Sequence, residues 1–163
     1  MMLKPAKKPI QQTVILCLVT LLFTLQKHGG FMLGFVLLLL APSFLKSLYF
    51  IFVKNREREQ RSIQTFLWVV SCSVVVIHHI HLHKTTQDFA EQVSSAVVTY
   101  YQQNGFYPDS AEALDFDKQA LTHHGLYYSH KNGAPLLWYR ATWIVYDIYM
   151  FNFNDNSWCY QAN

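Results

Sequence analysis

The sequence has few residues that could cross-link the chain or catalyse a reaction. Of its three cysteines, Cys17 and Cys72 lie in apolar runs, where we expect small buried side chains. Cys159 is the only cysteine in the last eighty or so residues, so no disulfide can form there, and we expect a buried strand cysteine. No glycine-rich phosphate loop occurs, and no nucleophile elbow surrounds Ser110 or Ser129. These absences argue against phosphate-binding and hydrolytic activities.

Charge is also scarce, at 14% of the residues, and it is unevenly distributed. Residues 1–62 hold nine Lys and Arg against two acidic residues, whereas residues 84–163 hold four against eight. The overall charge of +3 therefore combines a basic N-terminal half with an acidic C-terminal half. Neither half has the basic surface that nucleic-acid binding requires, so we expect no nucleic-acid partner.

Three long apolar runs fill the first half of the chain, at residues 9–25, 31–53 and 63–80. A helix needs roughly 20 residues to cross the hydrocarbon core of a bilayer. We therefore predict three transmembrane helices and the lipid bilayer as a partner. The alternative for residues 1–25 is a cleaved signal peptide, which is disfavoured because residues 26–28 offer no small-x-small cleavage site.

The basic residues predict the orientation of these helices. They precede the first run and separate the second from the third, and they comprise Lys4, Lys7, Lys8, Lys54, Arg56, Arg58 and Arg61. By the positive-inside rule, the N-terminus and the basic loop are cytoplasmic and the C-terminal domain is periplasmic, in a bacterial inner membrane. We divide the chain into a two-span anchor, 1–62, and a transmembrane helix with a periplasmic domain, 63–163.

The C-terminal half predicts an α+β fold. Residues 80–104 contain no Pro or Gly and repeat apolar side chains at helical spacing, which indicates one helix over 62–103 that Gly105 ends. Asn132-Gly133 indicates a hairpin, and the period then changes to two. We expect a small antiparallel meander packed on the helix, with strands at 127–130, 135–140, 142–153 and 157–161.

The segment 96–108 reads AVVTYYQQNGFYP: a paired aromatic, a polar couple, Asn-Gly and an aromatic-Pro after a long apolar helix. It resembles the point where the helix of type IV pilins and type II pseudopilins meets its globular part. The resemblance covers about the last hundred residues and implies a pilin-like periplasmic domain. The maturation pattern differs, because Gly30-Phe31 is followed by Phe35 where pilins have Glu, and two spans precede the pilin-like helix. We therefore expect a tethered domain and no polymerising subunit.

Four histidines lie at the end of the third apolar run and just beyond it: His78, His79, His81 and His83. On a helix, the i, i+3 and i, i+4 pairs among them could bind zinc or copper through two imidazoles. A third ligand would have to come from His123, His124 or His130. The alternative is an interfacial polar belt without metal, which we favour.

Catalysis has little support in the remaining residues. A triad could be drawn from Ser110 or Ser129 with His123 or His124 and Asp117, without the local sequence that such sites need. We therefore predict that the protein is not an enzyme.

The last strands are unusually rich in Trp and Tyr, and large exposed aromatics are typical of protein-binding hot spots. The candidate protein-binding residues are Trp138, Arg140, Trp143, Asp147, Tyr149 and Trp158. The hypothesis from sequence is an inner-membrane protein that binds a periplasmic protein, favouring immunity-type neutralisation of a toxin. One alternative is an accessory factor of type IV pilus or type II secretion assembly, and another is a metal- or haem-binding membrane protein.

Overall fold

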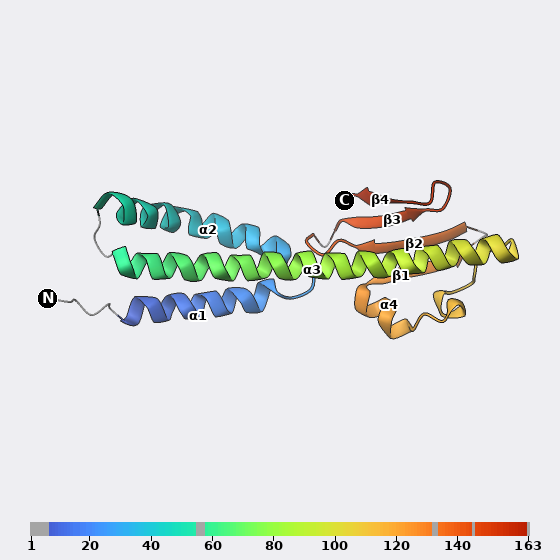
Figure 1. Cartoon of the computed structure of the whole chain (residues 1–163), viewed down its shortest axis with the longest axis horizontal. Helices are drawn as coiled ribbons and strands as arrows, with labels where there is room; N and C mark the ends of the chain where they lie inside the picture. Colours follow the sequence, from blue (N-terminus) through green and yellow to red (C-terminus); the bar gives the residue numbers. More distant parts are fainter. Residues whose placement is uncertain (1–6, 55–57, 132–133, 145, 163) are drawn as a thin grey trace. The chain divides into compact units, whose positions relative to one another are not determined.

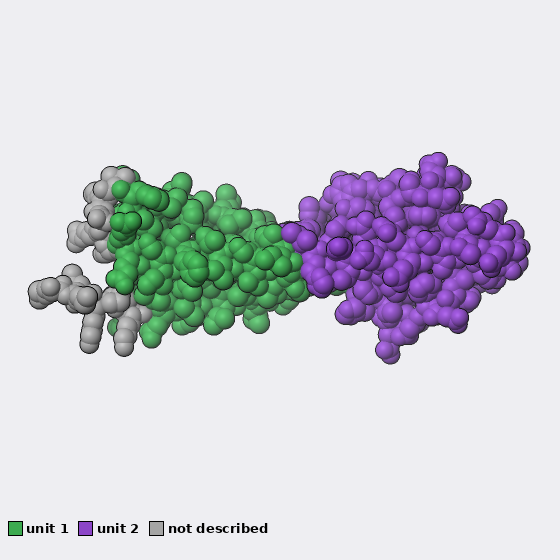
Figure 2. All heavy atoms as spheres, in the orientation of Figure 1, with its two compact units in different colours: residues 1–79 green, residues 80–163 purple. Residues whose placement is uncertain are grey.

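The structure is a computed structural model that describes residues 7–54, 58–131, 134–144 and 146–162. Figure 1 shows the order of the elements, with long helices first and a sheet at the end. The chain divides into an N-terminal unit, residues 1–79, and a C-terminal unit, residues 80–163 (Figure 2). The expected α+β class is thereby confirmed, with long apolar helices and a four-stranded antiparallel sheet.

The N-terminal unit consists of α1 (Lys7–Thr24), α2 (Gly30–Tyr49) with the π-helical turn η1 (Phe50–Lys54), and the first part of α3 (Arg58–Asn104). Its apolar side chains face outward, and Leu38, Leu39 and Phe52 are 73%, 79% and 78% exposed. In the part of the chain that is described, two helices are long and apolar enough to cross a membrane, Gly30–Phe52 and α3. The expectation of three such helices is therefore met by two, because the apolar part of α1 covers only Lys8–Thr24.

Two side chains of α3 hold α1 alongside it. Near one end of α1, the Gln64 Nε2 donates hydrogen bonds to the Pro9 carbonyl oxygen at 3.2 Å and to the Thr13 hydroxyl at 3.1 Å. At the other end, the buried His79 Nε2 lies 2.8 Å from the Thr24 carbonyl oxygen. The intervals Pro9 to Thr24 and Gln64 to His79 are both 15 residues long. The two helices therefore run parallel without slipping, over about 22 Å at 1.5 Å per residue.

The C-terminal unit has one hydrophobic core between α3 and the sheet. Ala90, Val93 and Val97 lie on one face of α3 at helical spacing and are fully buried. They pack with residues of the sheet and of the short helices η2 (Ala111–Leu114) and α4 (Lys118–His124), among them Ala111, Leu121, Leu126, Leu137, Tyr139 and Phe151.

The strands β1 (Leu126–Lys131), β2 (Ala134–Arg140), β3 (Ile148–Asn152) and β4 (Ser157–Gln161) pair antiparallel in the order β1-β2-β3-β4. Directly paired residues share one side of a sheet, and successive residues alternate between the sides. The row Leu126, Tyr139, Tyr149 and Tyr160 therefore lies on the inner face, towards the core, and the row Tyr127, Trp138, Met150 and Cys159 lies on the outer face.

The element bounds confirm most of the expected order and correct two parts of it. Helix α3 ends at Asn104, where Gly105 adopts a φ of 76° and its N–H bonds the Tyr101 carbonyl. The strand expected at 142–153 is only Ile148–Asn152, because the residues before it form a loop. Helix α4 was not predicted, although Asp117 caps its first turn and Gly125 ends it with a φ of 67°. The hairpin residues Asn132 and Gly133 lie outside the described residues.

Candidate protein-binding surface

The six residues expected to form one binding surface lie in three different places. Trp138 and Arg140 are on the outer face of β2, Tyr149 and Trp158 are on the inner face of the sheet, and Trp143 and Asp147 are in the β2–β3 loop. The strand expected at 142–153 would have included both Trp143 and Tyr149, but Trp143 precedes β3.

Asp147 closes the β2–β3 loop and is 5% exposed, so it is not the free surface carboxylate that we expected. Its carbonyl oxygen accepts a hydrogen bond from the Ala141 N–H at 2.9 Å, and its N–H donates to the Ile144 carbonyl at 3.3 Å. Its side chain accepts a hydrogen bond from the Tyr160 hydroxyl of β4. This hydrogen bond raises the pKa of Tyr160, because it favours the protonated phenol. Asp147 therefore holds the loop against the end of the sheet.

Tyr149 and Trp158 belong to the aromatic packing of the inner face. The Tyr149 ring stacks on Tyr139 with centroids 5.1 Å apart, and the Trp158 ring meets Tyr139 edge-on at 5.2 Å. Burial is the largest cause that raises the pKa of Tyr139 far above its usual range. Truncating Tyr149 or Trp158 would therefore test stability before it tested binding.

The outer face is the exposed aromatic surface of the C-terminal unit. We define it by seven side chains: Tyr127, Leu136, Trp138, Arg140, Ile148, Met150 and Cys159. The Tyr127 and Trp138 rings are stacked with centroids 4.4 Å apart and planes 16° apart. Tyr127 is 50% and Leu136 40% exposed, and among the described residues no outer-face side chain joins the core cluster. The surface thus offers an ordered aromatic pair, an apolar surround and one cation.

The β2–β3 loop adds apolar area at one end of the sheet. Ile144 is 44% and Tyr146 72% exposed, and both lie between the end of β2 and the start of β3. Cys159 is also exposed, which corrects the expected buried thiol. The residues that the sequence-based prediction omitted are Tyr127, Leu136, Ile144, Tyr146 and Met150. Tyr127, Leu136 and Met150 alternate with core residues along their strands, and this alternation could have placed them on the outer face.

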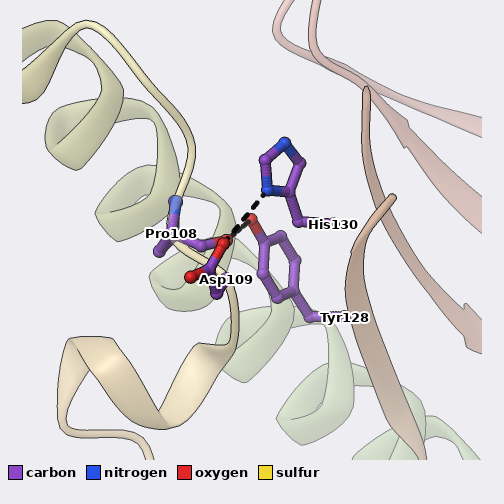
Figure 3. A network of polar contacts seen from close by, with 4 residues as sticks. All are labelled: Pro108, Asp109, Tyr128 and His130. Carbon is purple, nitrogen blue, oxygen red and sulfur yellow. Dashed lines mark hydrogen bonds and ion pairs between the residues drawn. The ribbon is translucent and has the colours of Figure 1, made fainter. Parts of the chain in front are cut away.

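At the far end of α3, the loop that follows the helix is attached to β1 (Figure 3). The Tyr128 hydroxyl donates a 2.7 Å hydrogen bond to the Pro108 carbonyl oxygen, and the His130 Nδ1 lies 3.5 Å from the Asp109 Oδ1. Burial, followed by the nearby Tyr107 and Asp109, raises the pKa of Tyr128 to about 12. Asp109 itself is fully exposed, so these contacts position the loop and form no enclosed polar site.

The four histidines of α3 point to different surroundings. His79 is buried against α1, and the His78 ring meets the His79 ring edge-on with centroids 5.5 Å apart. The His83 ring lies 5.5 Å from the Tyr149 ring, and His81 is exposed. Among the described residues, no three His, Cys, Asp or Glu side chains converge in a geometry that could hold a metal ion. The considered triad residue Asp117 caps α4, and His124 stacks on Phe89 with centroids 4.4 Å apart.

Comparison with protein-family models, curated proteins and solved structures finds no match.

Proposed function

We propose that this protein is a non-enzymatic bacterial inner-membrane protein whose periplasmic domain binds another protein. The observation that carries the proposal is the outer face, where the stacked Tyr127–Trp138 pair lies beside the exposed Leu136 and Arg140 and the partly buried Ile148 and Met150. Rigid aromatics and Arg are the side chains enriched in binding hot spots. An apolar surface of this kind is typical of interaction sites.

The proposal includes two membrane spans, Gly30–Phe52 and the apolar first part of α3, with the basic loop between them in the cytoplasm. The outward apolar side chains of α2 and the length of both helices support these spans. The positive-inside rule supports the orientation. A fusion of a periplasmic enzyme reporter after Gln161 should be active and a cytoplasmic reporter silent, and the opposite result would contradict the topology.

The biological role that we propose is neutralisation of a toxin that acts in the periplasm, as membrane-tethered immunity proteins do. A small domain with an acidic balance and an aromatic surface suits that role. The alternative is an accessory role in pilus or type II secretion assembly. It is favoured by one observation, the antiparallel meander packed on the C-terminal part of a long helix, which the pilin resemblance implies.

A photo-crosslinking amino acid at Leu136, in the complete protein in living cells, tests both roles. We expect a cross-linked periplasmic protein, with a toxin supporting neutralisation and a pilin-like subunit supporting assembly. The matched control is the same probe at Phe106, which is 58% exposed in the loop that follows α3. Trp138→Ala should weaken the identified complex by about 2 kcal/mol or more, whereas Phe106→Ala should not. Products at Phe106 and none at Leu136 would contradict the proposed surface.

A further inference from the structure

A cavity of about 830 Å³ lies between the three helices of the N-terminal unit. This volume is within the range of about 300–1,000 Å³ that small-molecule sites occupy. Its apolar lining includes Leu16 of α1, Leu37 and Leu40 of α2, and Val69 and Val76 of α3.

The apolar lining continues onto the outer surface of the helices. Leu37 is 50% and Ile77 66% exposed, although both also line the cavity. The cavity is therefore a groove that opens sideways between the helices. In a bilayer such an opening faces lipid tails, and an apolar chain can enter it without crossing water.

One end of the groove is polar. Gln64, Thr13 and the buried Ser47 line it there, and Gln64 bonds both the Pro9 carbonyl oxygen and Thr13. These bonds fix the wall that α1 and α3 form.

A cation lies one helical turn beyond this polar end. Arg61 precedes Gln64 by three residues on α3, which places both on the same side of the helix. The Arg61 guanidinium carbon is 4.6 Å from the centroid of the Phe50 ring, and Phe50 follows Ser47 by three residues. The Arg61–Phe50 contact thus joins α3 to η1, the turn that follows α2, near the polar end of the groove.

We propose that this groove binds an anionic phospholipid of the bilayer, with an acyl chain along the apolar lining and the phosphate at Arg61. Charge complementarity selects this occupant, because a positive group at the end of an apolar groove between membrane helices matches a negatively charged head group above a lipid tail. The inference rests on the membrane part of the proposed function. It does not depend on the outer face or its partner.

The test uses the full chain, purified and reconstituted in nanodiscs of equal phosphatidylglycerol and phosphatidylcholine, with retained lipid identified by native mass spectrometry. We expect preferential retention of phosphatidylglycerol by about fivefold, the ratio expected from one basic residue near an anionic lipid. Arg61→Gln should abolish the preference. Ser43→Phe, which places a ring in the groove from an exposed position, should reduce retention of both lipids.

The matched control is Lys46→Gln, which removes one positive charge from an exposed position of α2 outside the groove lining. It should leave the preference unchanged. Equal retention of the two lipids by the unaltered protein, a preference that survives Arg61→Gln, or lipid retention that Ser43→Phe does not reduce, would overturn the inference. So would a dimer that carries no lipid, because a second chain would then occupy the groove.

Carbonate extraction of cell membranes separates the two proposals. If the protein stays in the membrane pellet but shows no lipid preference, only the lipid site is wrong. Should carbonate release it into the supernatant, the membrane part of the proposed function is wrong and the lipid site with it.

Discussion

The two units use apolar side chains in opposite ways. In the N-terminal unit, Cys17, Leu33 and Val75 are the described hydrophobic residues that are buried, while most of the apolar side chains are exposed. In the C-terminal unit, nine buried residues form one cluster beneath the sheet. The first pattern is stable only where the surroundings are apolar, and the second is what water imposes on a small domain. The position of the apolar residues thus indicates the solvent for which each unit is built.

The largest expected effect comes from removing a side chain of the C-terminal core. Leu137→Ala should lower the free energy of unfolding of this unit by about 2–5 kcal/mol, because a fully buried leucine leaves a cavity. The matched control is Leu136→Ala, because Leu136 is the neighbouring residue, on the outer face and 40% exposed. This substitution should change the free energy of unfolding by less than about 0.5 kcal/mol. Near-UV circular dichroism during denaturant titration measures both. Equal losses would show that the outer face is also buried.

A smaller effect is expected in the N-terminal unit, where polar contacts join helices that have little buried area. His79→Leu removes the hydrogen bond to the Thr24 carbonyl and should weaken the α1–α3 contact by about 1–2 kcal/mol. The readout is the rate at which a thiol reagent reaches the buried Cys17 of α1, in a chain with Cys72 and Cys159 changed to Ser. The rate should rise about fivefold or more. His78→Leu is the control, and an equal rise there would rule out a specific role for His79.

The smallest effect concerns the loop after α3. Tyr128→Phe should lower the free energy of unfolding by about 1 kcal/mol at neutral pH, because it removes the hydrogen bond to the Pro108 carbonyl. The raised pKa of Tyr128 means that the folded state keeps the phenol neutral, so its contribution is complete below pH 10 and is lost as the pH rises to about 12. Unfolding curves at several pH values should show that the free energy of unfolding falls less steeply above pH 10 in Tyr128→Phe than in the unaltered protein. An unchanged decline would contradict the burial of this hydroxyl.

Local patterns predicted the regular elements well. The helix at 62–103, its end at Gly105 and the strand at 157–161 agree with the structure to within a few residues, because helical spacing, a positive-φ glycine and polar turns act locally. The short helix α4 was missed although Asp117 and Gly125 mark both of its ends.

The binding surface could not be predicted to the same extent. The alternation over 142–153 suggested a strand, yet the loop hydrogen bonds between Ala141 and Asp147 replace half of it. The burial of Asp147 depends on Tyr160, which belongs to a different strand. Whether Tyr149 or Trp138 faces the core depends on the register between strands, which period-two patterns leave open.

The stacked Tyr127–Trp138 pair also makes the outer face optically observable. Indole emission responds to the polarity around the ring, and Trp138 is partly buried beside a nearly parallel phenol. Trp68 belongs to the N-terminal unit, whereas Trp143 and Trp158 lie in the loop and on the inner face. With those three replaced by Phe, the fluorescence of the remaining indole would report contact at the outer face in real time, without any added label.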